Sequence, residues 1–169
     1  LFRSSAASDV YKRQIEYHRD YRVMLESAQP DLLSIATSDH AHAEIAVKGA
    51  LGSPRAILCE KPIATTLADA DRMIAACSEK QTLLSVEHTR RWDPTFLRAR
   101  QLVQSGELGS LRTIVAEMFS PRAMLMRNGI HVIDLFSFFA DVDARPQWLV
   151  GELEEGFESY GSYSVSYTH

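Results

Sequence analysis

The sequence predicts an α/β protein in which part of a doubly wound parallel sheet precedes a second domain of helices and strands. Short apolar runs alternate with amphipathic segments across short joints, a pattern typical of βαβ units. The run in RAILCE (55–60) is continuously apolar between its charged ends, as expected for a strand covered on both faces of a parallel sheet. The charged and aromatic joint HTRRWDP (88–94) then breaks the alternation, so we place the domain boundary after residue 89.

Three helices and three strands are expected in the first domain. Thr66 and Asp69 match a capping box ahead of an apolar periodic segment, which indicates that a helix begins there. The expected order is a helix over 15–28, a strand within 29–38, a helix over 41–51, a strand over 55–60, a helix over 66–80 and a strand over 82–88.

The second domain begins with a helix over 94–109 whose two ends carry recognisable signals. Pro94 occupies its first turn and Gly109 follows its last, an asymmetry that is typical of helices. Beyond it the pattern predicts a strand over 110–120, a buried helix over 129–141 and a strand over 147–155.

Neither end of the chain shows hydrophobic periodicity. Residues 1–14 and 164–169 resemble translated adapter sequence, so we expect a non-native head and tail and set both aside from the fold. The native part is then expected to be a partial domain over 15–89 and a second partial domain over 90–163, a piece of a longer protein cut at both ends.

Composition excludes several classes of function. With 46% hydrophobic and 24% charged residues, the chain is able to bury a globular core. Its net charge of −4 gives no basic footprint for nucleic acid, and no apolar run is long enough to span a bilayer. The two cysteines, Cys59 and Cys77, form neither a disulfide framework nor a metal-binding spacing, and they suit a reducing cytosol.

Lys61 stands two residues beyond Cys59, where an apolar strand is expected to end. Ligands of open α/β sheets bind beyond the carboxyl ends of the strands, and Pro62 restricts the backbone of the residue before it. An ammonium held there can donate a hydrogen bond to a substrate hydroxyl and raise its acidity, or relay its proton. A salt bridge with Glu60, or a plain surface position, explains the residue equally well from spacing alone.

His131 and Asp134 are three residues apart on an expected helix and share one of its faces. An imidazole beside a carboxylate titrates near neutral pH and suits a general base. Without further context, a buried histidine bonded to a backbone carbonyl, with Asp134 as a structural partner, explains the pair better.

The segment TSDHAHAE (37–44) raises the question of a metal, because His40, His42 and Glu44 alternate. If the helix begins near residue 41, however, residues two apart point in different directions and do not share an ion. Thr37 and Ser38 are better placed to touch a ligand, or else to cap a helix.

A further candidate lies in the joint HTRRWDP. Its arginines Arg90 and Arg91 suit either a phosphate or carboxylate clamp or a brace at the domain boundary.

Four segments together resemble one known family. They are DLLSIATSDHAHAEIA, ILCEKPIATTLADADRMIAAC, RRWDPTFLRARQLVQSGELGSLRTI and GIHVIDL, and they occur in the order and spacing of the glucose–fructose oxidoreductase/inositol dehydrogenase/MocA (Gfo/Idh/MocA) family. The resemblance covers about residues 17–150. It implies an N-terminal Rossmann-type domain that binds NAD or NADP. It also implies a C-terminal α/β domain with an open sheet, incomplete in this chain, that completes a pocket for a sugar or polyol. It further implies a cytoplasmic oxidoreductase that is homo-oligomeric at full length, with no nucleic-acid or membrane partner.

The resemblance also implies roles for particular residues. Lys61 of the EKP motif and His131 of the G-x-H-x-x-D motif are implied to be catalytic, with His131 taking the hydroxyl proton and Lys61 stabilising the developing alkoxide while the nicotinamide accepts hydride. The implied cofactor-binding residues are Thr37, Ser38, His42, Glu60, Lys61, Pro62 and Arg91. The implied substrate-binding residues are Lys61, Arg127, His131 and Asp134, and no metal is implied.

The chain departs from the family pattern at three positions. Arg127 stands where an aspartate is often found, Ser38 where proline is common, and Thr89 where asparagine is common. It also contains no G-x-G-x-x-G turn for the pyrophosphate, so the polypeptide is expected to be inactive alone. Two other functions therefore stay open: a cofactor-binding sensor or regulator without turnover, and a metal-dependent hydrolase that uses His40, His42 and His131.

Overall fold

The computed structural model describes residues 16–118, 125–140, 145–153 and 163–168. Residue contacts divide the chain into two units, Leu1–Glu87 and His88–His169, which we call unit 1 and unit 2 and describe separately. The division expected from the sequence falls after residue 89. Among the described residues, no helix has the length and apolar character needed to cross a membrane.

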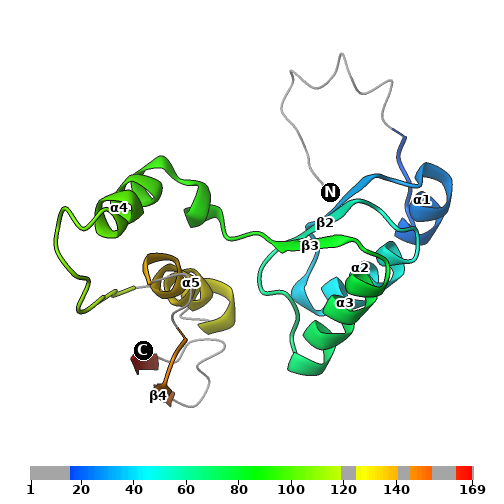
Figure 1. The fold of residues 1–169 in the computed structure, drawn as a ribbon. Coiled ribbons are helices and arrows are strands. Elements are labelled where there is room, and N and C mark those ends of the chain that lie inside the picture. Colours follow the sequence, from blue (N-terminus) through cyan, green and yellow to red (C-terminus); the bar gives the residue numbers. More distant parts are fainter. Residues whose placement is uncertain (1–15, 119–124, 141–144, 154–162, 169) are drawn as a thin grey trace, which may run out of the picture. The chain divides into compact units, whose positions relative to one another are not determined.

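Unit 1 is built on a parallel sheet (Figure 1). Its strands are β1 (Leu32–Ile35), β2 (Ala56–Cys59) and β3 (Leu83–Val86), in the spatial order β1-β2-β3, and they confirm the three strands predicted for this half. Ile35 lies opposite Cys59, and Cys59 lies opposite Val86, so all three strands end at the same edge of the sheet. We call this edge the carboxyl edge.

The helices of unit 1 connect these strands. They are α1 (Tyr21–Ala28), α2 (His42–Ala50), which the short 3-10 turn η3 (Asp39–Ala41) precedes, and α3 (Leu67–Glu79). Helix α1 begins later than the predicted residue 15, because the Asp20 carboxylate accepts from the Arg22 N–H at 2.9 Å and caps the helix there. The predicted helix start at Thr66 is confirmed: the Thr66 hydroxyl oxygen caps α3 by accepting from the Asp69 N–H at 3.1 Å.

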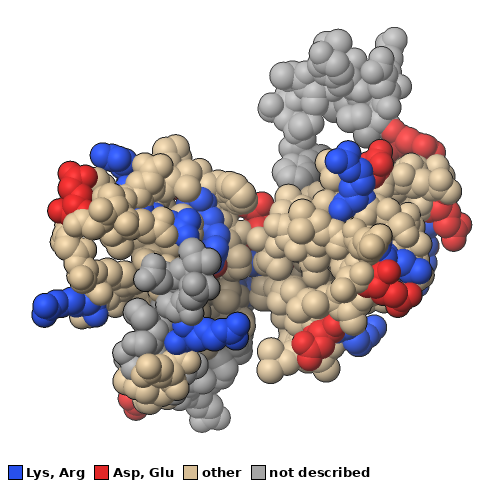
Figure 2. Space-filling view, viewed as in Figure 1, with Lys and Arg blue, Asp and Glu red and all other residues tan. Residues whose placement is uncertain are grey.

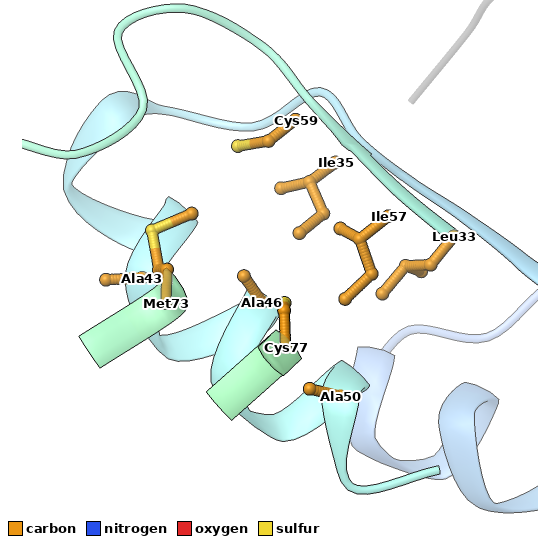
Figure 3. Close-up of a cluster of buried hydrophobic side chains, with 9 residues drawn as sticks. All are labelled: Leu33, Ile35, Ala43, Ala46, Ala50, Ile57, Cys59, Met73 and Cys77. Atoms are coloured by element: carbon orange, nitrogen blue, oxygen red, sulfur yellow. The ribbon is translucent and has the colours of Figure 1, made fainter. Parts of the chain in front are cut away.

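The core of unit 1 lies between one face of the sheet and helices α2 and α3 (Figure 3). Its members are Leu33, Ile35, Ala43, Ala46, Ala50, Ile57, Cys59, Met73 and Cys77. The intervening strand residues point away from it: Leu32 is 70% exposed and Leu58 is 41% exposed. The described helices therefore cover one face of the sheet, whereas the apolar run in RAILCE predicts a strand covered on both faces.

Unit 2 begins with helices. A 3-10 turn, η4 (Thr89–Trp92), leads into α4 (Pro94–Gln104), and the π-helical turn η5 (Leu125–Gly129) leads into α5 (Ile130–Phe139). Pro94 is in the first turn of α4 as predicted, and Asp93 caps that turn by accepting from the Thr95 N–H at 2.7 Å. The helix ends five residues before Gly109, the stop signal, whose φ is +80°.

The strands of unit 2 differ from the prediction in two places. The strand expected over 147–155 is confirmed as β4 (Trp148–Leu153). Its antiparallel partner is β5 (Tyr163–Thr168), all but the first residue of which lies in the segment set aside as a tail. The strand predicted over 110–120 is wrong for residues 110–118, which form no strand; residues 119 and 120 lie outside the described residues. A strand needs a partner for its backbone groups, and within the described part of the chain β4 and β5 pair with each other.

Candidate active site

Two loops of unit 1 meet at the carboxyl edge of the sheet. Thr37 lies two residues beyond Ile35, the last residue of β1, and Lys61 lies two residues beyond Cys59, the last residue of β2. Because Ile35 and Cys59 are opposite each other in neighbouring strands, these loops leave the sheet side by side. The structure thus brings together the two unit 1 segments that the sequence marks as functional.

The turn that carries Lys61 continues the sheet for one residue and then leaves it. The Glu60 N–H donates to the Ile35 carbonyl at 2.9 Å, which extends the parallel pairing past Cys59. The Lys61 N–H then donates to the Glu60 carboxylate at 3.2 Å, a local contact in place of a strand partner. Pro62 follows with a cis peptide bond and is buried, whereas Lys61 itself is half-buried.

The loop after β1 presents short hydroxyl side chains. Thr37 and Ser38 are both exposed. The Thr37 hydroxyl lies 3.5 Å from the Ser38 carbonyl, and the Ser38 hydroxyl lies 3.3 Å from Nε2 of His40. Ser38 precedes η3 but makes no capping hydrogen bond with its side chain, so its hydroxyl is not committed to the helix. Exposed hydroxyls and backbone groups at this edge fit a polar ligand such as a dinucleotide.

His42 takes a position that its sequence pattern does not indicate. The imidazole is 1% exposed, with Nδ1 lying 2.8 Å from the Pro62 carbonyl oxygen and Nε2 lying 3.3 Å from the Thr37 carbonyl oxygen. A ring enclosed in this way has no surface left for a ligand, so direct cofactor contact by its side chain does not fit the geometry. His42 instead contacts the backbone of both strand-end loops from the protein interior.

A metal site over TSDHAHAE also does not fit. His40 is exposed and bonds to Ser38, whereas His42 points inward to two carbonyl oxygens. In the part of the chain that the structure describes, no three His, Cys, Asp or Glu side chains are arranged to hold an ion.

In unit 2, the Arg91 guanidinium forms a hydrogen-bonded ion pair with the Asp134 carboxylate. The Arg91 Nε donates to both carboxylate oxygens at 2.9 Å, and Nη2 lies 2.7 Å from Oδ1. The pair ties the turn η4 to helix α5, and Arg91 also lies over the ring of Phe138, 5.4 Å from its centroid. Residues predicted to touch cofactor and substrate, respectively, are therefore bonded to each other.

His131 and Arg127 lie at the start of the same helical segment. His131 is the second residue of α5 and is half-buried, one turn before Asp134. Arg127 lies in the π-helical turn η5 just before it and is exposed. The G-x-H-x-x-D motif is thus helical as predicted, with Gly129 buried in the turn that precedes it.

Sequence reasoning missed two residues that contact helix α5, His88 at Asp134 and Arg100 at Phe138. The Nδ1 of His88 lies 3.8 Å from Oδ2 of Asp134, so an imidazole and a guanidinium both face that carboxylate. Arg100 stacks on Phe138, 4.7 Å from the ring centroid. The position of His88 directly after an apolar strand was the available signal, whereas nothing in the spacing of Arg100 points to Phe138.

Both cysteines behave as core residues. Burial raises the pKa of the Cys59 thiol to about 11, with a smaller contribution from the Glu60 carboxylate, and burial also raises the pKa of Cys77. Thiols that stay protonated near neutral pH are poor nucleophiles. The chemistry of the carboxyl edge therefore belongs to other residues.

The surface carries mixed charge. Over the described residues of the face shown in Figure 2, lysine and arginine side chains are interspersed with aspartate and glutamate.

A parallel sheet with its polar loops gathered at the carboxyl edge defines a Rossmann-type, nucleotide-binding α/β protein. A family model described as an oxidoreductase family with an NAD-binding Rossmann fold matches residues 3–88, a range that includes most of the head set aside above. The chain belongs to this family, the Gfo/Idh/MocA oxidoreductases.

Similar proteins agree with this assignment. The chain is 28% identical over 151 residues to an inositol 2-dehydrogenase of Salmonella paratyphi B, covering 83% of this chain and 44% of the relative. It is 34% identical over 141 residues to a D-apiose dehydrogenase of Paraburkholderia graminis, covering 74% of this chain and 37% of the relative. The chain therefore spans less than half the length of these relatives.

The fold has matches among solved structures. An oxidoreductase from Sinorhizobium meliloti superimposes with a TM-score of 0.72 at 19% identity, covering 90% of this chain and 46% of that structure. At this identity the likeness concerns the fold alone.

Proposed function

We propose that the full-length protein is an NAD- or NADP-dependent dehydrogenase that oxidises a hydroxyl group of a sugar or polyol. The observation that carries the proposal is the position of Lys61, half-buried beyond the end of β2 and beside the exposed loop that follows β1. This is the edge at which open α/β sheets bind their ligands. The family membership and the dehydrogenase relatives support the same reading.

The residues of unit 1 suit a dinucleotide. The hydroxyls of Thr37 and Ser38 and the backbone of Glu60 to Pro62 would hold it. His42 would support this backbone through its contact with the Pro62 carbonyl oxygen. Arg91 in unit 2 is the remaining cofactor-binding candidate. A bound nicotinamide supplies the acceptor for hydride.

Two side chains have the chemistry that the reaction needs. Lys61 donates a hydrogen bond to the substrate oxygen and so stabilises negative charge as it develops there. His131 accepts the proton of the hydroxyl. Arg127, exposed before α5, and Asp134 are the further substrate-binding candidates, and an arginine at that position favours a substrate with an acidic group. We further propose a cytoplasmic, homo-oligomeric protein.

Substitution of Lys61 tests the proposal. The full-length protein is assayed with NAD⁺ and NADP⁺ against myo-inositol, scyllo-inositol, D-apiose and a panel of sugar acids, and formation of reduced nicotinamide is followed. Lys61→Met is expected to lower kcat roughly 10²- to 10³-fold, since one stabilising donor is removed. Lys80→Met, in which another lysine at the far end of α3 is replaced, serves as the matched control and is expected to retain full activity. Equal rates for the two variants would contradict the role of Lys61.

A regulatory protein that binds cofactor without turnover is the alternative, and Arg127 in place of the family's usual aspartate favours it. Titration of the nicotinamide cofactor separates the two possibilities. Micromolar binding without turnover on any sugar, polyol or sugar acid would support the regulator, whereas turnover that Lys61→Met abolishes supports the dehydrogenase.

A further inference from the structure

The imidazole of His42 links two loops that the sheet places side by side at its carboxyl edge. It is buried at the start of α2, 2.8 Å from the carbonyl oxygen of Pro62 and 3.3 Å from that of Thr37. One loop follows β1 and the other follows β2, and these strands are hydrogen-bonded neighbours. A single side chain therefore lies against both segments that form the candidate nucleotide site.

The chemistry of the ring fixes which bond is the stronger. Both partners are carbonyl oxygens, which only accept, and a neutral imidazole has a single N–H to donate. The shorter contact, from Nδ1 to Pro62, is the one that matches a good hydrogen bond, and so the ring donates from Nδ1. With the proton on Nδ1, Nε2 has none to donate, so its 3.3 Å approach to the Thr37 carbonyl is a packing contact and not a hydrogen bond.

This bond acts where the sheet no longer supports the backbone. The Glu60 N–H is the last backbone group of this strand to bond across to β1, at Ile35. The Lys61 N–H turns back to the Glu60 side chain, and Pro62 has no N–H to donate. The hydrogen bond from His42 to the Pro62 carbonyl is thus an anchor for the backbone on the far side of Lys61.

We propose that His42 is a positioning residue, which sets the place from which Lys61 acts by holding the Pro62 carbonyl. The inference rests on the proposed function of Lys61. His42 itself touches neither substrate nor cofactor, because its side chain is enclosed by the protein. A displacement of about 1 Å at a reacting group costs as much as 10²-fold in rate. Loss of the bond from His42 to Pro62 is therefore expected to loosen the turn that carries Lys61 and to lower kcat.

A pair of substitutions in the full-length protein isolates the Nδ1 bond. His42→Asn places an amide N–H near the position of Nδ1, whereas His42→Gln places it near that of Nε2. We expect His42→Gln to lower kcat roughly 10-fold or more, with the dissociation constant of NAD⁺ changed less than about 3-fold, and His42→Asn to stay within about 3-fold of the parent. Equal losses in the two variants would overturn the proposal.

Thr82→Val controls for a general loss of stability. The buried Thr82 hydroxyl donates to the Pro54 carbonyl at 2.7 Å, which is the same kind of bond at the opposite edge of the same sheet. This variant is expected to lower the melting temperature as His42→Gln does while leaving kcat unchanged. A comparable loss of kcat in Thr82→Val would mean that His42 acts through stability alone, against the proposal.

Amide hydrogen exchange gives a readout that does not depend on activity. We expect faster exchange in the peptide 60–66 for His42→Gln and unchanged exchange for His42→Asn and Thr82→Val. If exchange follows this pattern while Lys61→Met keeps full rate, the positioning of the turn is upheld and the catalytic role of Lys61 is what fails. If exchange in 60–66 is the same in all variants, His42 does not hold the turn.

Discussion

The guanidinium of Arg91 binds the carboxylate of Asp134 through three contacts of 2.7 to 2.9 Å. The two residues are 43 positions apart in the sequence, in the turn η4 and in helix α5. The carboxylate is 8% exposed and the guanidinium 40% exposed, so the negative charge is the more deeply buried partner. The pair fixes the helix that carries His131 to the segment that opens unit 2.

The unequal burial predicts unequal effects of removing each partner. Arg91→Ala leaves a buried carboxylate without its main partner and is expected to lower the free energy of unfolding by about 3 kcal/mol. Asp134→Asn leaves a guanidinium that reaches water, and a loss of about 1 kcal/mol is expected. Urea unfolding followed by tryptophan fluorescence measures both, because Trp92 and Trp148 lie in unit 2.

Arg98→Ala is the matched control for this comparison, since Arg98 is an exposed arginine of α4. It is expected to change the stability by less than about 0.5 kcal/mol. A larger effect for Asp134→Asn than for Arg91→Ala would contradict the assignment of the carboxylate as the buried partner.

The parallel sheet of unit 1 could be predicted because its signals are local. Three apolar runs, a capping box at Thr66 and short joints specify strands and helices without knowledge of the rest of the chain. The strand predicted over 110–120 failed because pairing depends on a partner elsewhere in the chain. Strand β5 was missed because residues 164–169 were set aside as a tail, so the alternation of polar and apolar residues in YSVSYT (163–168) was overlooked.

The sequence was sufficient to predict which loops form the candidate site, but not the contacts that hold those loops in place. Strand ends are visible in the sequence, so the positions of Thr37 and Lys61 followed from the rule that ligands bind beyond them. The partners of buried polar groups were not visible. Neither the bond from His42 to Pro62 nor that from Arg91 to Asp134 follows from spacing, because each joins segments that only the folded chain brings together.

The close packing of Gly49 against Leu33 predicts that an added side chain at this position destabilises the fold. It lies in α2, and a Cβ built there would collide with Cδ2 of Leu33 in strand β1. Alanine is favoured over glycine in a helix by about 1 kcal/mol, yet Leu33 is packed in the core and has little room to move. Overpacking costs about 1–3 kcal/mol, so Gly49→Ala is expected to be destabilising by about 1 kcal/mol net.

A double-mutant cycle attributes that loss to the contact. Gly49→Ala is combined with Leu33→Val, which removes the colliding reach of the side chain, and chemical unfolding is followed by circular dichroism. The double variant is expected to be more stable than the sum of the single effects by about 1 kcal/mol. Gly52→Ala, where an added Cβ meets only the Gly49 carbonyl oxygen at 3.5 Å, is the control; strict additivity of the cycle would count against the collision.

The buried thiol of Cys59 predicts how stability depends on alkaline pH. Burial raises its pKa from the ordinary 9.0 to about 11 in the folded protein, and the carboxylate of Glu60 contributes in the same direction. Below pH 9 the thiol is protonated in both states and stability does not depend on it. Between pH 9 and about 11 the unfolded chain releases this proton and the folded chain does not, so the free energy of unfolding falls as the pH rises.

Cys59→Ala removes this titration and isolates it from the tyrosines and lysines that also ionise at high pH. The variant is expected to be less stable than the parent by a constant amount up to pH 9, because it leaves a small cavity in the core. From pH 9 towards 11 the difference is expected to shrink, since only the parent loses the stability supplied by its protonated thiol. Urea midpoints measured at half-unit intervals of pH record the comparison, and a difference that stays constant across this window would show that the thiol ionises equally easily in the folded and unfolded chain.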